Sequence, residues 1–208
     1  MDSITPTFEK VIKTMIDNSL INLHTAMPAI VESFDPIKKE ISAVPAIKRK
    51  LSSGEVNDLP LIENIPICYP QSSSALISFP LKKGDSVMLI FSERSLDLWK
   101  SKGGKVNPND VRKHDLSDAV AIPGVFSKNK GLPAHAENLV IQHNDATINM
   151  SPDNKFSIGN NSQELLTILS DLLTALSEAK TNTMLGPQPL FNFTTYLQLK
   201  ANLSEIKI

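Results

Sequence analysis

Cysteine is almost absent from this chain of 208 residues, and aromatic residues are scarce. The single cysteine, Cys68, excludes a disulfide within the chain and zinc sites built from several cysteines. Its apolar neighbours predict a buried, inert thiol. Aromatic residues make up only 5% of the sequence. A protein that binds single-stranded nucleic acid usually combines exposed aromatics with basic residues, so this composition argues against that class.

The chain also lacks an excess of either charge and any long apolar run. Its 21 basic residues nearly cancel its 22 acidic residues, so it has no basic face for nucleic acid. No apolar stretch approaches the roughly 20 residues that a membrane-spanning helix needs. The polar first ten residues do not resemble a secretion signal. We therefore expect synthesis in the cytoplasm without an export signal.

Residues 1–26 have the periodicity of an amphipathic helix. Thr5 and Pro6 are typical of a helix start. Apolar residues then recur at helical spacing, and the helix must place this stripe against its own domain or a neighbour. The stripe consists of Phe8, Val11, Ile12, Met15 and Ile16.

Residues 27–130 change to short apolar segments separated by turns, which predicts a small antiparallel barrel of five strands. In the segment 37–51, Ile37, Ile41, Ala43 and Ile47 share one parity, which predicts a long curved strand with one wet face. The other predicted strands are 29–34, 59–70, 74–81 and 86–91. A polar loop follows them and ends in a last apolar segment before residue 126.

Residues 131–161 contain three very short strand candidates with few apolar side chains each. Such strands cannot bury a core within one chain, so we expect them to become stable by stacking or by wrapping with symmetry mates. The candidate contacts between chains are Leu139, Ile141, Ile148 and Phe156.

Residues 162–208 predict a helical hairpin. Ser162 is the expected cap of the first helix, and the second helix is expected at about 193–206. The apolar face of the first helix is too wide for a solvent-exposed helix, so it also needs a partner. Its candidate contacts are Leu165, Ile168, Leu172 and Leu176.

The charged residues do not form a recognisable catalytic constellation. Glu93, Arg94 and Asp97 follow a strand, and carboxylates flanking an arginine favour an ion-paired corner closed by Trp99. The His114-Asp115 pair lies in a stretch typical of a self-ordered polar loop. We therefore expect no enzyme, no cofactor and no metal site within one chain. One alternative stays open: in a trimer, three copies of His143 could surround an axial ion.

Two stretches of this sequence resemble the N-terminal domain of phage baseplate spike proteins, the central spikes of contractile-tailed phages. They are GDSVMLIFSERSLDLW from Gly84 and RKHDLSDAVAIPGV from Arg112. The resemblance spans about Glu32 to Gly124, and LLTILSDLLTAL with MLGPQPL extends it toward the C-terminus. The motif residues are Gly84, Asp85, Glu93, Arg94, Ser95, Asp97, Trp99, His114, Asp115, Leu116, Ser117, Asp118 and Ala119.

The resemblance implies a homotrimer in the virion, at the tail baseplate. Each chain would contribute an oligonucleotide/oligosaccharide-binding (OB) barrel and a short β-prism or β-helix stalk of intertwined strands. It would bind a tail hub protein and meet the host outer membrane when the sheath contracts. This chain lacks the His-x-His tip and the lysozyme insertion of some spikes. It therefore leaves open a hub-to-spike adaptor with a separate tip protein, an OB module for saccharide or nucleic acid, and an envelope-degrading enzyme.

Overall fold

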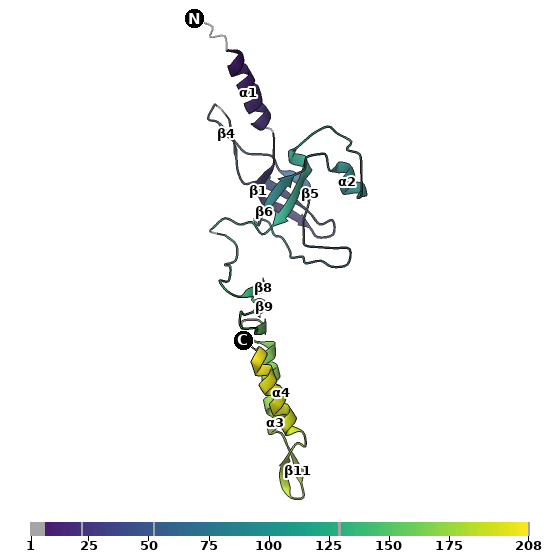
Figure 1. The fold of residues 1–208 in the computed structure, drawn as a ribbon, viewed down its shortest axis with the longest axis vertical. Helices are drawn as coiled ribbons and strands as arrows, with labels where there is room; N and C mark the ends of the chain where they lie inside the picture. The colour runs from purple at the N-terminus through teal and green to yellow at the C-terminus, as the bar shows by residue number, and fades with distance from the viewer. Residues whose placement is uncertain (1–6, 22, 52, 129, 208) are drawn as a thin grey trace. The chain divides into compact units, whose positions relative to one another are not determined.

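We describe a computed structural model, which covers residues 7–21, 23–51, 53–128 and 130–207. The chain is mainly β and divides into two compact units, Met1–Gly131 and Leu132–Ile208 (Figure 1). The first unit contains α1 (Phe8–Ile21), β1 (Ala26–Asp35), β2 (Glu40–Pro45), β3 (Arg49–Lys50), β4 (Val56–Asn57), β5 (Ile62–Pro66), β6 (Ser86–Phe91), α2 (Asp97–Lys102), the short 3₁₀ helix η1 (Leu116–Asp118) and β7 (Ala119–Pro123).

The first unit is built on a five-stranded antiparallel sheet in the order β5-β2-β1-β6-β7. The strands alternate between buried and outward residues, and the sheet curls into a half-barrel around the inward ones. Where β5 ends, Ile67 forms a parallel bridge with Ala121 of β7, and the Cys68 N–H donates to the Ala121 carbonyl (2.8 Å). The buried core is Ala29, Val31, Ile41, Ala43, Ile62, Ile65, Ile67, Tyr69, Leu81, Val87, Leu89, Phe91, Ala119 and Ala121.

The predicted long strand at 37–51 is wrong. The Asp35 carboxylate accepts hydrogen bonds from the backbone of Ile37 and Lys38, and Lys39 has a φ of 58°. The chain therefore reverses before β2, and Ile37 lies in this turn at 92% exposure. Beyond Pro45 the strand ends and Ile47 is also exposed, so only the middle of the predicted apolar face is buried.

Two further local predictions for the first unit are wrong. Residues 74–81 form no named strand, because the Ser72 hydroxyl accepts from the Ser74 and Ala75 N–H groups and holds the chain in a turn. Cys68 is exposed rather than buried, since the strand alternation points its neighbours Ile67 and Tyr69 inward.

Helix α1 has no buried residue. Thr5 and Pro6, which the sequence suggests as its start, lie outside the described residues.

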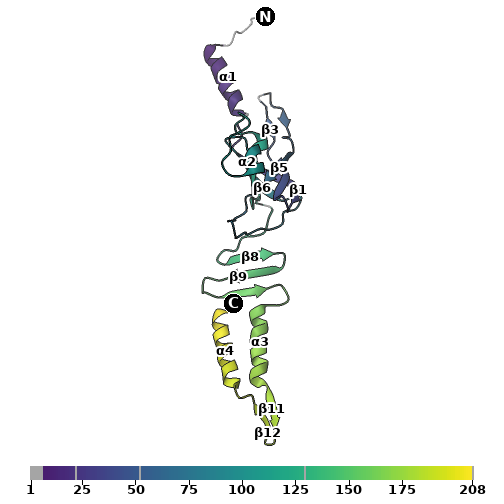
Figure 2. The same ribbon diagram turned by 90° about the vertical axis from the view of Figure 1, so that its right-hand side faces the viewer.

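The second unit combines a small sheet with two helices (Figure 2). Its three-stranded sheet has the order β10-β9-β8, and α3 packs against α4. Between the two helices the chain forms a β-hairpin rather than a simple break, because Lys180–Thr183 pairs antiparallel with Gly186–Pro189. Its elements are β8 (Leu139–His143), β9 (Ala146–Met150), β10 (Phe156–Gly159), α3 (Leu165–Glu178), β11 (Lys180–Thr183), β12 (Gly186–Pro189) and α4 (Phe193–Ile206).

The cap of α3 is Glu164 and not Ser162. The Glu164 carboxylate accepts from the N–H groups of Leu166 (2.9 Å) and Thr167 (2.6 Å), whereas the Ser162 N–H is held by Asn160. Burial alone would raise the pKa of Glu164, but these hydrogen bonds lower it to about 2. A carboxylate at a helix start also interacts favourably with the helix dipole.

Candidate functional site

Several residues of the two quoted stretches meet at a buried carboxylate, that of Asp118. It lies at the end of η1, directly before β7, and is fully buried. Arg112 donates to it from Nε (2.6 Å) and from Nη2 (3.0 Å), and the Leu96 N–H donates to it at 2.8 Å. Asp118 therefore connects the loop after β6 to the loop before β7.

Arg112 extends this contact to two more carboxylates. Its Nη2 donates to Asp97 on α2 (2.7 Å), and its Nη1 lies 3.5 Å from Asp110. We call Arg112, Asp97, Asp110 and Asp118 the Arg112 clamp. Because one guanidinium contacts three carboxylates from separate segments, the clamp fixes the shape of the excursion between β6 and β7.

The electrostatics of the clamp favour its charged form. The hydrogen bonds that Arg112 donates to Asp118 and Asp97 raise its pKa above the ordinary value. Burial alone would raise the pKa of Asp118, but the hydrogen bonds from Arg112 and from the Leu96 N–H lower it below its ordinary value. The ion pair is therefore intact at neutral pH.

The His-Asp-Leu-Ser-Asp stretch supports the clamp locally. The Asp115 carboxylate accepts from the Ser117 N–H (2.9 Å) and hydroxyl (2.6 Å), which starts η1. These bonds lower the pKa of Asp115. His114 has a φ of 49°, and its N–H donates to the Ser92 carbonyl (3.1 Å), so the stretch returns to the end of β6.

Lys100 of α2 also reaches this stretch, since its ammonium donates to the Ser117 carbonyl (3.2 Å). Burial lowers the pKa of Lys100, although the nearby carboxylates act in the opposite direction.

The predicted corner after β6 is only partly as expected. The Arg94 Nη2 and the Glu93 Oε1 are 3.4 Å apart, and both side chains are exposed. The partner of Asp97 is Arg112 and not Arg94. Trp99 is 46% exposed, so its ring is only partly buried at the start of the loop. Sequence reasoning missed the role of Arg112, although it lies in the quoted motif six residues before Asp118.

Gly84 and Asp85 lie in a different turn, directly before β6. Gly84 has a φ of 94°, and its N–H donates to the Val31 carbonyl (2.8 Å). The Asp85 carboxylate accepts from the Lys82 N–H (2.7 Å) and closes the turn. These two motif residues therefore set the start of a core strand and do not join the Arg112 clamp.

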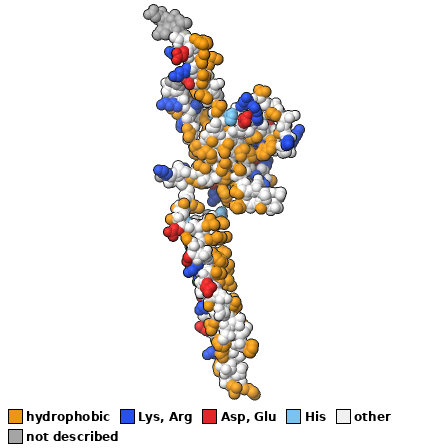
Figure 3. All heavy atoms as spheres, viewed as in Figure 1, with side chains coloured by type: hydrophobic (Ala, Val, Ile, Leu, Met, Phe, Trp, Pro, Cys, Tyr) orange, Lys and Arg blue, Asp and Glu red, His pale blue; other side chains and the backbone are white. Residues whose placement is uncertain are grey.

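The second unit presents an uncovered apolar sheet face. The register places Leu139 opposite Met150, and Ile141 opposite Ile148. Ile158 in turn lies opposite Ile148, so apolar side chains from all three strands share one face. Figure 3 shows hydrophobic side chains along this unit. We call this set the apolar sheet face: Leu139, Ile141, Ile148, Met150, Phe156 and Ile158.

Most of this face is exposed in the single chain. Leu139 and Ile141 are each more than 60% exposed, and only Phe156 is half-buried. His143 lies on the same face beside Ile141, opposite Ala146. Among the residues that the structure describes, no three His, Cys, Asp or Glu side chains gather as metal ligands would.

Helix α3 has a second apolar stripe besides the one that packs. Leu166 is buried. Leu165, Ile168 and Leu172 are exposed, and Leu176 is half-buried. The structure thus leaves most of the predicted contact residues without cover in one chain. Within the described part of the chain, no helix is long and apolar enough to cross a bilayer.

Comparison with known proteins matches the first unit. Residues 27–124 match the family model described as Phage protein Gp138 N-terminal domain, which spans the half-barrel and the Arg112 clamp. No curated protein matches the chain. The family match supports a phage protein.

Proposed function

We propose that this protein is a structural component of a phage tail, in which three copies form a central spike at the baseplate. The observation that carries the proposal is the apolar sheet face, most of which is exposed in one chain, together with the exposed apolar stripe on α3. Threefold association would remove these side chains from water, at about 25 cal/mol per Å² of apolar surface. The match to a phage protein domain supports the phage context.

In this proposal the first unit is an OB-type barrel. Its strand order and the parallel bridge between Ile67 and Ala121 support a nearly closed barrel. The outward face of β6 and β7 also carries exposed Ile90 and Ile122, which suit contact with a neighbouring copy or with the hub. Helix α1, with its exposed apolar residues, is the proposed attachment to the tail hub.

The proposed action is mechanical, and the protein helps to penetrate the host envelope when the sheath contracts. A trimer with a large apolar interface resists shear because separation of the chains would expose its core. The Arg112 clamp suits this role, since both oxygens of Asp118 accept hydrogen bonds and hold loops in place. We propose neither an enzymatic activity nor a nucleic-acid partner.

Light scattering on the purified full chain tests the proposal. We expect the mass of a trimer, and a stable monomer would contradict it. Leu172→Asp places a charge on the exposed stripe of α3 and should reduce the mass to that of a monomer. Thr195→Asp, at an exposed polar position of α4, is the matched control and should leave the trimer intact. An unchanged mass for Leu172→Asp would refute the placement of α3 at the interface.

A further inference from the structure

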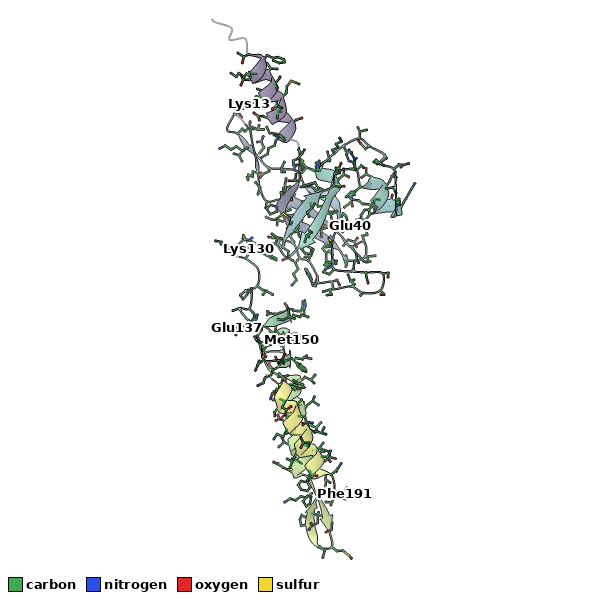
Figure 4. All side chains as sticks on the ribbon, in the orientation of Figure 1. Lys13, Glu40, Lys130, Glu137, Met150 and Phe191 are labelled. Atoms are coloured by element: carbon green, nitrogen blue, oxygen red, sulfur yellow. The ribbon has the colours of Figure 1, made fainter. Side chains whose placement is uncertain are left out.

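The β11–β12 hairpin ends in large apolar side chains that none of the described residues covers. Thr183 pairs with Gly186, so Met184 and Leu185 alone form the turn. Met184 is 107% exposed, Leu185 is 90% exposed, and Phe191 beside the hairpin is 104% exposed (Figure 4). Two-residue hairpin turns usually contain Asn, Asp or Gly. Turn geometry therefore does not explain why Met and Leu occupy this turn.

The same segment is free of charge. Residues 181–199 include no Asp, Glu, Lys or Arg, and Lys180 and Lys200 flank this stretch. The chain as a whole is 21% charged, and residues 64–81 of the first unit form another charge-free run of similar length. A charge-free tip can leave water without the large desolvation cost of an ionised group.

The Thr183 side chain pairs two backbone groups of the turn. The Thr183 hydroxyl donates to the Gly186 carbonyl (2.8 Å), and the Leu185 N–H donates to the Thr183 hydroxyl oxygen (3.2 Å). Gly186 has a φ of 94°, which lets the chain turn back into β12. An apolar phase offers no hydrogen bonds, so a segment that enters it must pair its backbone internally in this way.

We infer that the β11–β12 hairpin inserts its tip into a lipid surface. Met184, Leu185 and Phe191 enter the boundary between headgroups and acyl chains. Lys180 stays at the level of the lipid phosphates. It lies about 10 Å from the turn, because a strand rises about 3.4 Å per residue. Protruding side chains on a neutral turn suit a fluid apolar phase, because lipid needs no matching groove and no complementary charge.

This inference deepens the proposed function, since it names the lipid surface as the partner of the tip, and three tips in one trimer would act together. Each tip alone offers few apolar side chains, so membrane binding by a single copy is expected to be weak and reversible.

Vesicle flotation with the full chain tests the inference. One set of vesicles contains phosphatidylethanolamine with a minority of phosphatidylglycerol, and a second contains phosphatidylcholine alone. We expect the protein to float with both, since apolar insertion does not require anionic lipid. The double substitution Met184→Ser with Leu185→Ser should lower the bound fraction at least about fivefold, because it removes most of the inserted apolar surface.

The matched control is Ile77→Ser, which removes an exposed apolar side chain from the first unit and should float like the unchanged protein. A depth measurement adds a second readout. Leu185→Trp in a Trp99→Phe background should be quenched by brominated acyl chains. Quenching of Trp99 in the otherwise unchanged protein should be weak.

The outcomes separate this inference from the proposed trimer. A protein with trimer mass that does not float overturns the inference and leaves the trimer standing. Flotation that the double substitution does not reduce also overturns it. If the double substitution lowers the mass, the tip is a contact between copies and the lipid assignment is wrong. A monomer whose flotation depends on the tip supports the inference and overturns the trimer.

Discussion

Asp118 connects separate parts of the excursion between β6 and β7. Its buried carboxylate joins the Leu96 backbone to the Arg112 side chain, and Arg112 continues to Asp97 on α2. When one partner of a buried ion pair is removed, the charge of the other partner stays buried without a counter-charge. The free energy of unfolding then falls by more than the net stabilisation that the intact pair provides.

We expect Asp118→Ala to lower the free energy of unfolding by about 3 kcal/mol at neutral pH, near the lower end for a broken buried pair because Arg112 is partly exposed. Urea unfolding followed by the fluorescence of Trp99, which lies on α2 next to the clamp, measures this. Glu93→Ala removes an exposed carboxylate with an exposed partner and should change the free energy by under about 0.5 kcal/mol. Equal effects of the two substitutions would contradict the clamp.

The clamp also predicts an acid dependence. The pKa of Asp118 is lower in the folded state than its unfolded value of about 3.9, so the folded state binds this proton less readily. Its contribution is complete above that unfolded value and is lost as the pH falls through the lowered folded pKa. The difference in stability between the unchanged protein and Asp118→Ala should therefore shrink as the pH falls below 4. A difference that stays constant to the lowest measurable pH would show that the charge of Asp118 does not contribute.

Residue roles of this kind were only partly predictable from the sequence. The spacing around Asp97 suggested an ion pair with Arg94, the nearest cation, but the fold brings Arg112 to it instead. The choice between two arginines depends on the path of the loop between β6 and β7, and no local pattern encodes that path. The apolar run at 86–91, in contrast, is a local signal, and β6 forms over the residues predicted for it.

Helix α3 shows how one cap decides where an element begins. Glu164 receives two backbone N–H groups and the Thr167 hydroxyl, and it also accepts from the Ile158 N–H of β10. The cap therefore connects the helix to the small sheet of the second unit.

We expect Glu164→Ala to destabilise the second unit by about 1 kcal/mol, the typical cost of a lost helix cap. The pKa of Glu164 is lowered to about 2, so its contribution is complete above the unfolded value of about 4.3 and is lost as the pH falls toward 2. Thermal unfolding followed by circular dichroism at neutral and acid pH measures both effects. Gln163→Ala, an exposed neighbour whose side chain has no capping role in the structure, is the control. An equal loss in both variants would argue against the cap.

At this scale, period and composition predicted the second helix well, since α4 runs from Phe193 to Ile206. They missed the hairpin before it. Gly186, Pro187 and Pro189 indicate the end of a helix, but the same residues are compatible with an irregular loop. Pairing between Lys180–Thr183 and Gly186–Pro189 depends on the contact of two segments and gives no periodic signal over four residues.

The two units of the molecule carry different parts of the functional argument. The family match lies within the first unit, and most of the uncovered apolar surface that supports a trimer lies in the second. The sequence indicated this need for partners because it contains apolar stripes on strands too short to bury them. It could not supply the number of copies, which depends on how the faces fit together.

A trimer that buries these faces should show a thermal midpoint that depends on protein concentration. Dissociation and unfolding are then coupled, and a tenfold dilution should lower the midpoint by about 2–4 °C for a chain of this size. Differential scanning calorimetry over two orders of magnitude in concentration measures the shift. A midpoint independent of concentration, together with a monomer mass, would contradict the trimer.

The Arg112 clamp has one more consequence, which concerns protein engineering. Asp118, Arg112 and Leu96 fix both ends of the excursion between β6 and β7, while Gly103–Pro108 contains no helix or strand and is mostly exposed. Lengthening a loop whose ends are already held together lowers the free energy of unfolding only slightly, because the entropic cost of closing a loop grows only with the logarithm of its length. Foreign peptides placed between Gly103 and Gly104 should therefore be displayed on the virion without disturbing the sheet.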